Sequence, residues 1–181
     1  MSYTRVQALL DKSISRPTLF QMIIPIGARA NDQLEFMCKT ATVPEIRMNT
    51  IAVNGHEAMG VVREQGTQVV YGNPFSITVI SDRDYIVYDA IRAWFHSMAV
   101  NANPVLGGSQ KISYYDTIKR SMTLIKLEQG GDQNYIQPFR IRFNNAFPVA
   151  IGEIQLDTSS ENSYVEYTID FAYETYTYLP I

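Results

Sequence analysis

The most restrictive feature of this sequence is an alternating run near its C-terminal end. From Val165 to Tyr173 every second residue is large and apolar or aromatic, and the residues between them are Glu166, Thr168, Asp170 and Ala172. Because successive side chains of a β-strand point to opposite faces, this run predicts a strand with one buried and one polar face. The preceding run, Phe147 to Asp157, also carries strand formers and is joined to it by a polar turn. The rest of the chain must cover the apolar face.

Further strands are predicted along the chain. A length of 181 residues fits a single domain spanning residues 1–181. A buried strand at Leu19–Ile24 and an alternating segment at Gln33–Lys39 are expected to form a hairpin through Gly27–Asp32. The other predicted strands lie at Pro74–Ile80, Ser121–Glu128 and Tyr135–Phe143.

One amphipathic helix is expected to flank the strands. Ser81 is the predicted N-cap, with Asp84 three residues later, and the helix should run for about 17 residues. Its apolar stripe consists of Val87, Ile91, Trp94, Phe95 and Met98. The predicted fold is therefore mainly β (α+β), an antiparallel sandwich or barrel-like domain with one flanking helix.

Two segments are expected to need a partner. Residues 50–71 contain glycines and too few large apolar residues to form a core, which indicates an extended arm that contacts another subunit. Residues 1–15 are a second possible arm. The predicted contact residues in the first arm are Asn54, His56, Glu57 and Met59.

Composition excludes several functions. Charged residues make up only 18% of the chain, against about 25% in a typical soluble domain, and 12 tyrosines indicate a surface covered partly by other protein. The net charge of -3 argues against a phosphate-binding face. The single cysteine, Cys38, is typical of a chain that folds in a reducing cytoplasm. The sequence has no apolar run of about 18 residues, so no membrane insertion is expected.

Catalytic chemistry is not predicted. Surface or contact roles are favoured for His56 and His96, and no histidine pair has metal-ligand spacing. Asp82 and Asp84 are explained by helix capping, and Cys38 by burial. We expect no catalytic residue, no metal site and no cofactor. Two arginines, Arg140 and Arg142, share a strand face. Either they meet the acidic row Glu166, Asp170 and Glu174 across a sheet or subunit boundary, or they lie on a solvated face.

Four blocks, in order, carry a resemblance to a known family. They are Arg16–Phe20, then Phe36–Lys39 followed by Val43–Glu45, then Phe75–Asp82 leading into the Trp94 helix, and finally Phe147–Asp157. In their order and spacing the chain resembles the tail tube proteins of contractile-tailed bacteriophages. Segment 101–120 departs most from that family.

The resemblance implies a structural subunit. Six copies would close into a ring, and stacked rings would form the inner tube of a virion tail, assembled in the host cytoplasm. The implied partners are the tail sheath, baseplate and tail-terminator proteins, a tape-measure protein, and DNA that passes without specific binding. Glu166, Asp170 and Glu174 would face the lumen and repel phosphate.

Other functions stay open at this point. The same fold and stacking would suit the tube of a phage-like bacteriocin or of a secretion apparatus that carries no DNA. A monomeric small-ligand β-barrel would instead predict an apolar cavity. A hydrolase is disfavoured because no histidine-centred group is present.

Overall fold

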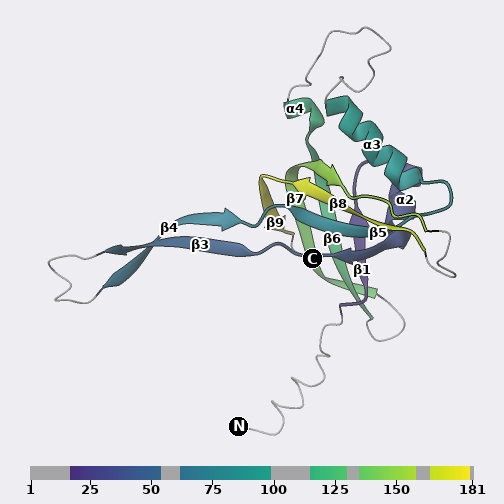
Figure 1. Cartoon of the computed structure of the whole chain (residues 1–181). Helices are drawn as coiled ribbons and strands as arrows, with labels where there is room; N and C mark the ends of the chain where they lie inside the picture. Colours follow the sequence, from purple (N-terminus) through teal and green to yellow (C-terminus); the bar gives the residue numbers. More distant parts are fainter. Residues whose placement is uncertain (1–16, 54–61, 99–114, 130–134, 158–163, 180–181) are drawn as a thin grey trace, which may run out of the picture.

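A single long strand connects the two halves of this fold. The structure is a computed structural model and describes residues 17–53, 62–98, 115–129, 135–157 and 164–179. Strand β7 (Tyr135–Ile151) pairs with β6 (Arg120–Gln129) through its first part and with β8 (Glu166–Ala172) through its last five residues. Asn145 lies two residues before the part that pairs with β8 and has φ 55°. The strand therefore belongs to both halves of the sheet (Figure 1).

The other strands extend each half of the sheet in antiparallel order. β1 (Phe20–Ile23) pairs with β6, and β9 (Thr175–Tyr178) pairs with β7. On the other side, β8 pairs with β5 (Phe75–Ile80), which pairs with β2 (Cys38–Ala41). The order of this seven-stranded sheet is β1-β6-β7-β8-β5-β2, with β9 on β7. The predicted mainly antiparallel β class is confirmed.

The apolar faces of the two halves meet in one core. Phe75 of β5 and Phe143 of β7 are fully buried, and their rings stack with centroids 4.4 Å apart. The predicted alternation of β8 is confirmed, because Tyr167, Ile169 and Phe171 are buried while their neighbours are only partly covered. The strand predictions for β1, β5 and the β6–β7 pair are confirmed as well.

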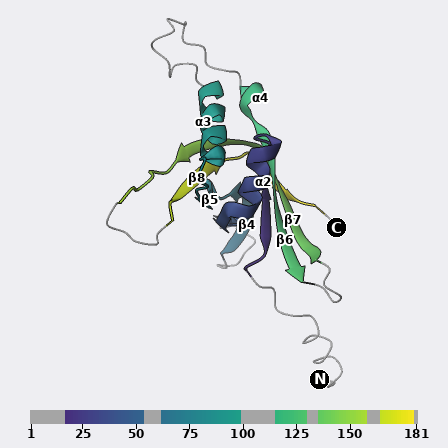
Figure 2. The ribbon, with the colours of Figure 1, turned by 90° about the vertical axis from the view of Figure 1, so that its right-hand side faces the viewer.

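Helix α3 (Ile86–Met98) covers this core. Of the predicted stripe, Val87, Ile91 and Trp94 are buried. The Trp94 ring lies 6.2 Å from that of Phe171, and its Nε1–H donates to the carbonyl of Ile118, 2.8 Å away. Ile118 ends the short helix α4 (Tyr115–Ile118). Figure 2 shows α3 and α2 (Ala28–Met37) beside the strands.

The predicted start of the long helix is wrong. The helix has 13 residues and begins at Ile86, whose N–H donates to Asp82 Oδ1 at 3.1 Å. Ser81 does not cap it, because the Ser81 hydroxyl donates to the Asp82 carbonyl instead. Tyr85 has φ 53°, which interrupts helical geometry just before Ile86.

The predicted hairpin between Leu19–Ile24 and Gln33–Lys39 is also wrong. Residues 28–37 form α2, and only the short β2 follows. Leu34 is buried within this helix, so its apolar side chain serves a helical face rather than a strand. The strands on either side of α2 pair with β6 and β5, not with each other.

Two strands leave this body as a separate hairpin. β3 (Ile46–Val53) pairs only with β4 (Arg63–Tyr71), and Figure 1 shows the hairpin extending away from the other strands. We call β3 and β4 the arm. Among the described residues, no helix has the length and apolar character needed to span a membrane.

Candidate functional site

The arm exposes apolar side chains on its surface. Met48 and Val69 are directly paired, and Ile46, two residues before Met48 in β3, lies on the same face. These three side chains retain 58%, 46% and 51% of their exposure. Ile51 and Val53 are also exposed. A solvated two-stranded hairpin has little to stabilise it by itself, so this surface is suited to contact with another chain.

Local contacts shape the arm near its middle. The pairing register shifts between Asn49 and Thr50, which marks a bulge. The Thr67 hydroxyl donates to the Asn49 carbonyl at 2.9 Å. A side chain at Gly66 would collide with the sulfur of Met48, so glycine lets Met48 lie across the arm.

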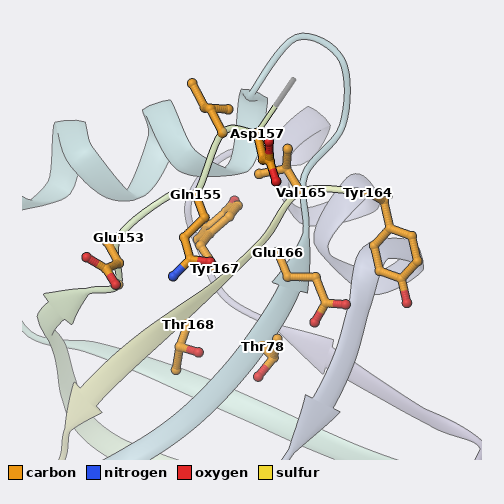
Figure 3. A pocket seen from close by; sticks show the side chains of 11 residues that line it. Thr78, Glu153, Gln155, Asp157, Tyr164, Val165, Glu166, Tyr167 and Thr168 are labelled. Carbon is orange, nitrogen blue, oxygen red and sulfur yellow. The ribbon is translucent and has the colours of Figure 1, made fainter. Parts of the chain in front are cut away.

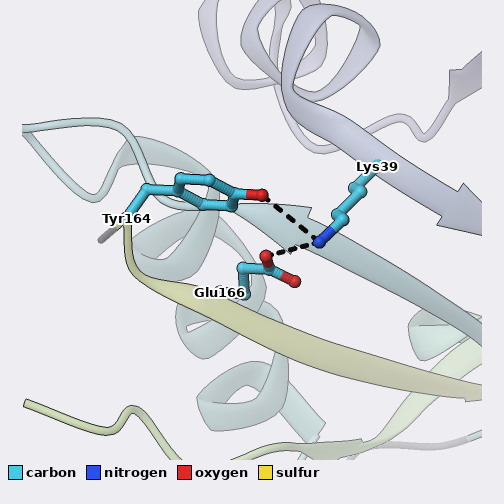
Figure 4. Close-up of polar contacts among 3 residues, drawn as sticks. All are labelled: Lys39, Tyr164 and Glu166. Carbon is cyan, nitrogen blue, oxygen red and sulfur yellow. Dashed lines mark hydrogen bonds and ion pairs between the residues drawn. The ribbon is translucent and has the colours of Figure 1, made fainter. Parts of the chain in front are cut away.

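A polar face lies on β8 and β5, opposite the core. Asp170 accepts a hydrogen bond from the Ser76 hydroxyl at 2.6 Å. Glu166 forms an ion pair with Lys39, whose Nζ lies 2.6 Å from Glu166 Oε1 and also donates to the Tyr164 hydroxyl at 3.4 Å (Figure 4). The hydrogen bond to Glu166, followed by that to Tyr164, raises the pKa of Lys39 above 10.5. Both predicted lumen carboxylates on β8 thus have partners within the chain.

An open hollow of about 920 Å³ adjoins this face. Glu153, Gln155 and Asp157 border one side and Tyr164 to Thr168 the other, as Figure 3 shows. The lining is mixed in polarity and contains no histidine or cysteine. In the described part of the chain, no three His, Cys, Asp or Glu side chains group as a metal site would need.

Comparison with protein-family models identifies the family to which this chain belongs. The family model described as phage tail tube protein matches residues 10–179. The chain belongs to the phage tail tube protein family. The predicted resemblance is confirmed. No curated protein sequence matches this tail tube protein.

Solved structures with the same fold accompany the family match. The chain from the sheath-tube complex of an extracellular contractile injection system (PVC), in its extended state, is 14% identical, with a TM-score of 0.58 over 100% of this chain and 99% of that chain. A chain from the sheath/tube terminator of that system is 12% identical, with a TM-score of 0.60 over 93% and 99%. One from the tube-terminating cap of the anti-feeding prophage is 14% identical, with a TM-score of 0.58 over 94% and 93%. These similarities support the tail-tube fold.

The remaining predicted residues of this tail tube protein are scattered. Glu174 follows β8 and accepts a hydrogen bond from the Asn145 side chain. Arg142 donates to the Ser121 hydroxyl at 3.2 Å, and its part of β7 pairs with β6 and β9. The acidic row on β8 therefore does not lie beside Arg140 or Arg142 within the chain. The predicted arm contacts Asn54, His56, Glu57 and Met59 lie outside the described residues, as do residues 1–15.

Sequence reasoning missed the partners of the acidic row. The sequence predicts Lys39 at the end of a strand that pairs with Leu19–Ile24, and this pairing does not bring Lys39 to Glu166. The sequence does indicate that Ser76 is available for a polar contact, because Ser76 lies on the polar face of a predicted strand, and that strand pairs with β8 in the structure. The apolar arm residues Ile46 and Met48 were missed because the predicted arm begins only at residue 50, whereas β3 begins at Ile46.

Proposed function

We propose that this chain is the ring-forming subunit of the tail tube of a contractile-tailed bacteriophage. Six copies close into a ring, and rings stack into a hollow tube through which DNA passes into the host. The observation that carries the proposal is the arm, whose apolar side chains Ile46, Met48 and Val69 are half exposed in a chain of the tail tube family. In the tube, the arm is covered by a neighbouring copy.

The sheet edges support the same proposal. Among the described residues, β1 and β2 are the outer strands in the order of the sheet, a position suited to pairing between subunits. Closing six sheets around a lumen removes such edges. As part of the proposal, we assign six residues to contacts between subunits: Asn54, His56, Glu57, Met59, Arg140 and Arg142.

The lumen is assigned to the polar face. Glu166, Asp170 and Glu174 line it, together with hydroxyl groups such as that of Thr168. A wall with few free cations does not bind the phosphate backbone tightly. Replacing Asp170 and Glu174 by Lys should slow DNA ejection without preventing tube assembly, and unchanged ejection would contradict this lining.

The partners of the assembled tube follow from the same proposal. The solved chains with this fold come from a sheath-tube complex, a sheath/tube terminator and a tube-terminating cap. We assign the corresponding partners to this chain: sheath, baseplate and tail-terminator proteins, with a tape-measure protein in the lumen during assembly. The subunit acts mechanically, within the virion tail, and not as an enzyme.

Electron microscopy tests the ring directly. The purified protein is imaged by negative stain over a range of concentrations, and six-fold rings or hollow rods are the expected result. Sedimentation velocity on the same samples measures the oligomer mass. A monomer at every concentration would overturn the proposal.

A tube from a phage-like injection apparatus is the second candidate. It is favoured by two solved structures with this fold, which come from a contractile injection system and from an anti-feeding prophage. Particles isolated from the producing cells separate the two, since only a phage tail is attached to a DNA-filled capsid. A small-ligand barrel is disfavoured, because the stacked Phe75 and Phe143 rings occupy the space between the sheet halves.

A further inference from the structure

At the root of the arm, the two chain segments that flank β3 and β4 lie side by side. Glu45 precedes β3 and Gly72 follows β4, and the Gly72 N–H donates to the Glu45 carbonyl at 2.9 Å. A Cβ at Gly72 would lie 3.1 Å from Glu45 Cγ and 3.3 Å from the Glu45 nitrogen. The two segments are therefore in tight contact where the arm leaves the body.

Two buried tyrosines, one just after β8 and one in β9, hold this root, and each of them bonds to one of the two segments. The Tyr176 hydroxyl donates to the Pro44 carbonyl at 3.0 Å, on the segment that enters β3. The Tyr173 hydroxyl donates to the Gly72 carbonyl, on the segment that leaves β4. Both tyrosines are 5% exposed. Asn73 adds two contacts with the Tyr173 backbone, accepting from its N–H at 3.3 Å and donating to its carbonyl at 3.4 Å.

Aromatic packing ties these tyrosines to the core. Phe143 lies 5.2 Å from Tyr173 and 5.9 Å from Tyr176, measured between ring centroids. Tyr71, the last residue of β4, packs edge-on against Tyr176 at 5.1 Å. Consecutive ring contacts thus connect Phe143 in the core with Tyr71 at the base of the arm. Burial raises the pKa of Tyr173 to about 12, so its hydroxyl keeps the proton that it donates.

Beyond this root, the described part of the arm is exposed and pairs only with itself. The direction of a stiff two-stranded ribbon is set where it is attached. We infer that Tyr173 and Tyr176 form a clamp that fixes the angle at which the arm leaves the body, and that a second copy of the chain recognises the arm at this angle. The second part rests on the proposed function.

The clamp makes the arm a preorganised binding element. An arm that swings freely must be ordered when it meets its partner, and this ordering weakens binding even when every contact residue is present. The two hydroxyls therefore affect assembly without lying on the contact surface. Tyr173 and Tyr176 are positioning residues in this sense.

Removing the two hydroxyls tests the clamp. The double variant Tyr173→Phe/Tyr176→Phe keeps ring volume and packing, and Tyr176→Phe alone is the milder version. The matched control is Tyr164→Phe, which removes a tyrosine hydroxyl at the Lys39 contact instead. Amide hydrogen exchange of the unassembled chain is followed by NMR. The Gly72 amide should exchange about five-fold faster for each hydroxyl removed, and amides of the β6–β7 pair should be unchanged.

Assembly of the same variants provides the second measurement. The double variant should need a protein concentration at least several-fold higher to polymerise, whereas Tyr164→Phe should polymerise as the native chain does. Unchanged exchange at Gly72 would overturn the clamp. Faster exchange with unaltered assembly would overturn the role of the angle and leave the proposed tube intact. If the native chain itself fails to assemble, the proposed function and the recognition step fail together, and the exchange data alone judge the clamp.

Discussion

Changing the apolar face of the arm should separate assembly from folding. The variant Ile46→Thr/Met48→Thr/Val69→Thr replaces three half-exposed side chains on one face of β3 and β4. Threonine keeps the preference for strand conformation. Substitutions at such exposed positions change stability by about 0.5 kcal/mol or less each. We therefore expect the variant to stay folded, with a circular dichroism spectrum like that of the native chain.

The effect on assembly follows from the area that remains exposed. Complete burial of a Val, Ile or Met side chain contributes about 1.5 to 3 kcal/mol. About half of each side chain is already covered, with 51%, 58% and 46% left for a partner. Each position then contributes about 1 kcal/mol to the contact, and the three contribute roughly 2 to 3 kcal/mol after allowing for the methyl group of threonine. Since 1.4 kcal/mol is a factor of ten, the critical concentration should rise roughly 30- to 150-fold.

Pelleting of polymer across a concentration series measures the critical concentration. The matched control is Asn49→Thr/Gln68→Thr, a directly paired and exposed set on the opposite face of the arm. This control should assemble within about two-fold of the native chain, since it removes no apolar surface. A folded triple variant that polymerises at the native concentration would refute the reasoning. An effect of the control alone would assign the contact to the opposite face.

Three further predictions concern the body of the protein. Burial raises the pKa of Cys38 to about 12, so iodoacetamide at pH 8 should label the native protein at least 100-fold more slowly than the urea-unfolded chain, and equal rates would contradict this burial. Lys39→Met should lower stability to urea at pH 7. Pairing with Glu166 raises the pKa of Lys39, so the ion pair stabilises the fold below pH 10.5 and this stabilisation disappears as the pH rises through the pKa of Lys39 in the folded state. A stability difference between the native chain and the variant that persists above that pKa would be inconsistent with the ion pair. Phe75→Ala should lower the free energy of unfolding by about 3 to 5 kcal/mol, because it removes a fully buried ring stacked on Phe143. The melting temperature should fall by roughly 10 °C, and a fall of less than about 2 °C would refute this packing.

The strictly alternating strands could be predicted from sequence because their burial pattern has a period of two. In β5 and β8 every second residue is buried, and the same residues are the large apolar ones. The segment Gln33–Lys39 was too short for such a pattern to decide. Leu34 fits a strand face and a helix face equally well, and packing of α2 against β1 and α3 selects the helix.

The candidate site was predictable only in part. The acidic face of β8 follows from sequence, but the partners of its carboxylates depend on strand order. Lys39 reaches Glu166 because β2 pairs with β5, and β5 with β8, across 127 positions of sequence. The clamp on the arm has the same origin, since Tyr173 meets Gly72 only after β5 and β8 have paired. Long-range pairing of this kind leaves no local pattern in the sequence.

The partners of the acidic row change the meaning of the proposed lumen. Lys39 balances the charge of Glu166, whereas Asp170 accepts a hydrogen bond from the neutral Ser76 hydroxyl and keeps its charge, so the polar face carries fewer unbalanced carboxylates than the sequence alone indicates. Such a wall repels phosphate less than a row of three unbalanced carboxylates would. Lys39 is the cation that balances this face within the chain, and removing it would leave Glu166 without its partner charge in every copy of the proposed ring. In the proposed tube, Lys39→Met should therefore make the wall more negative by one charge per copy.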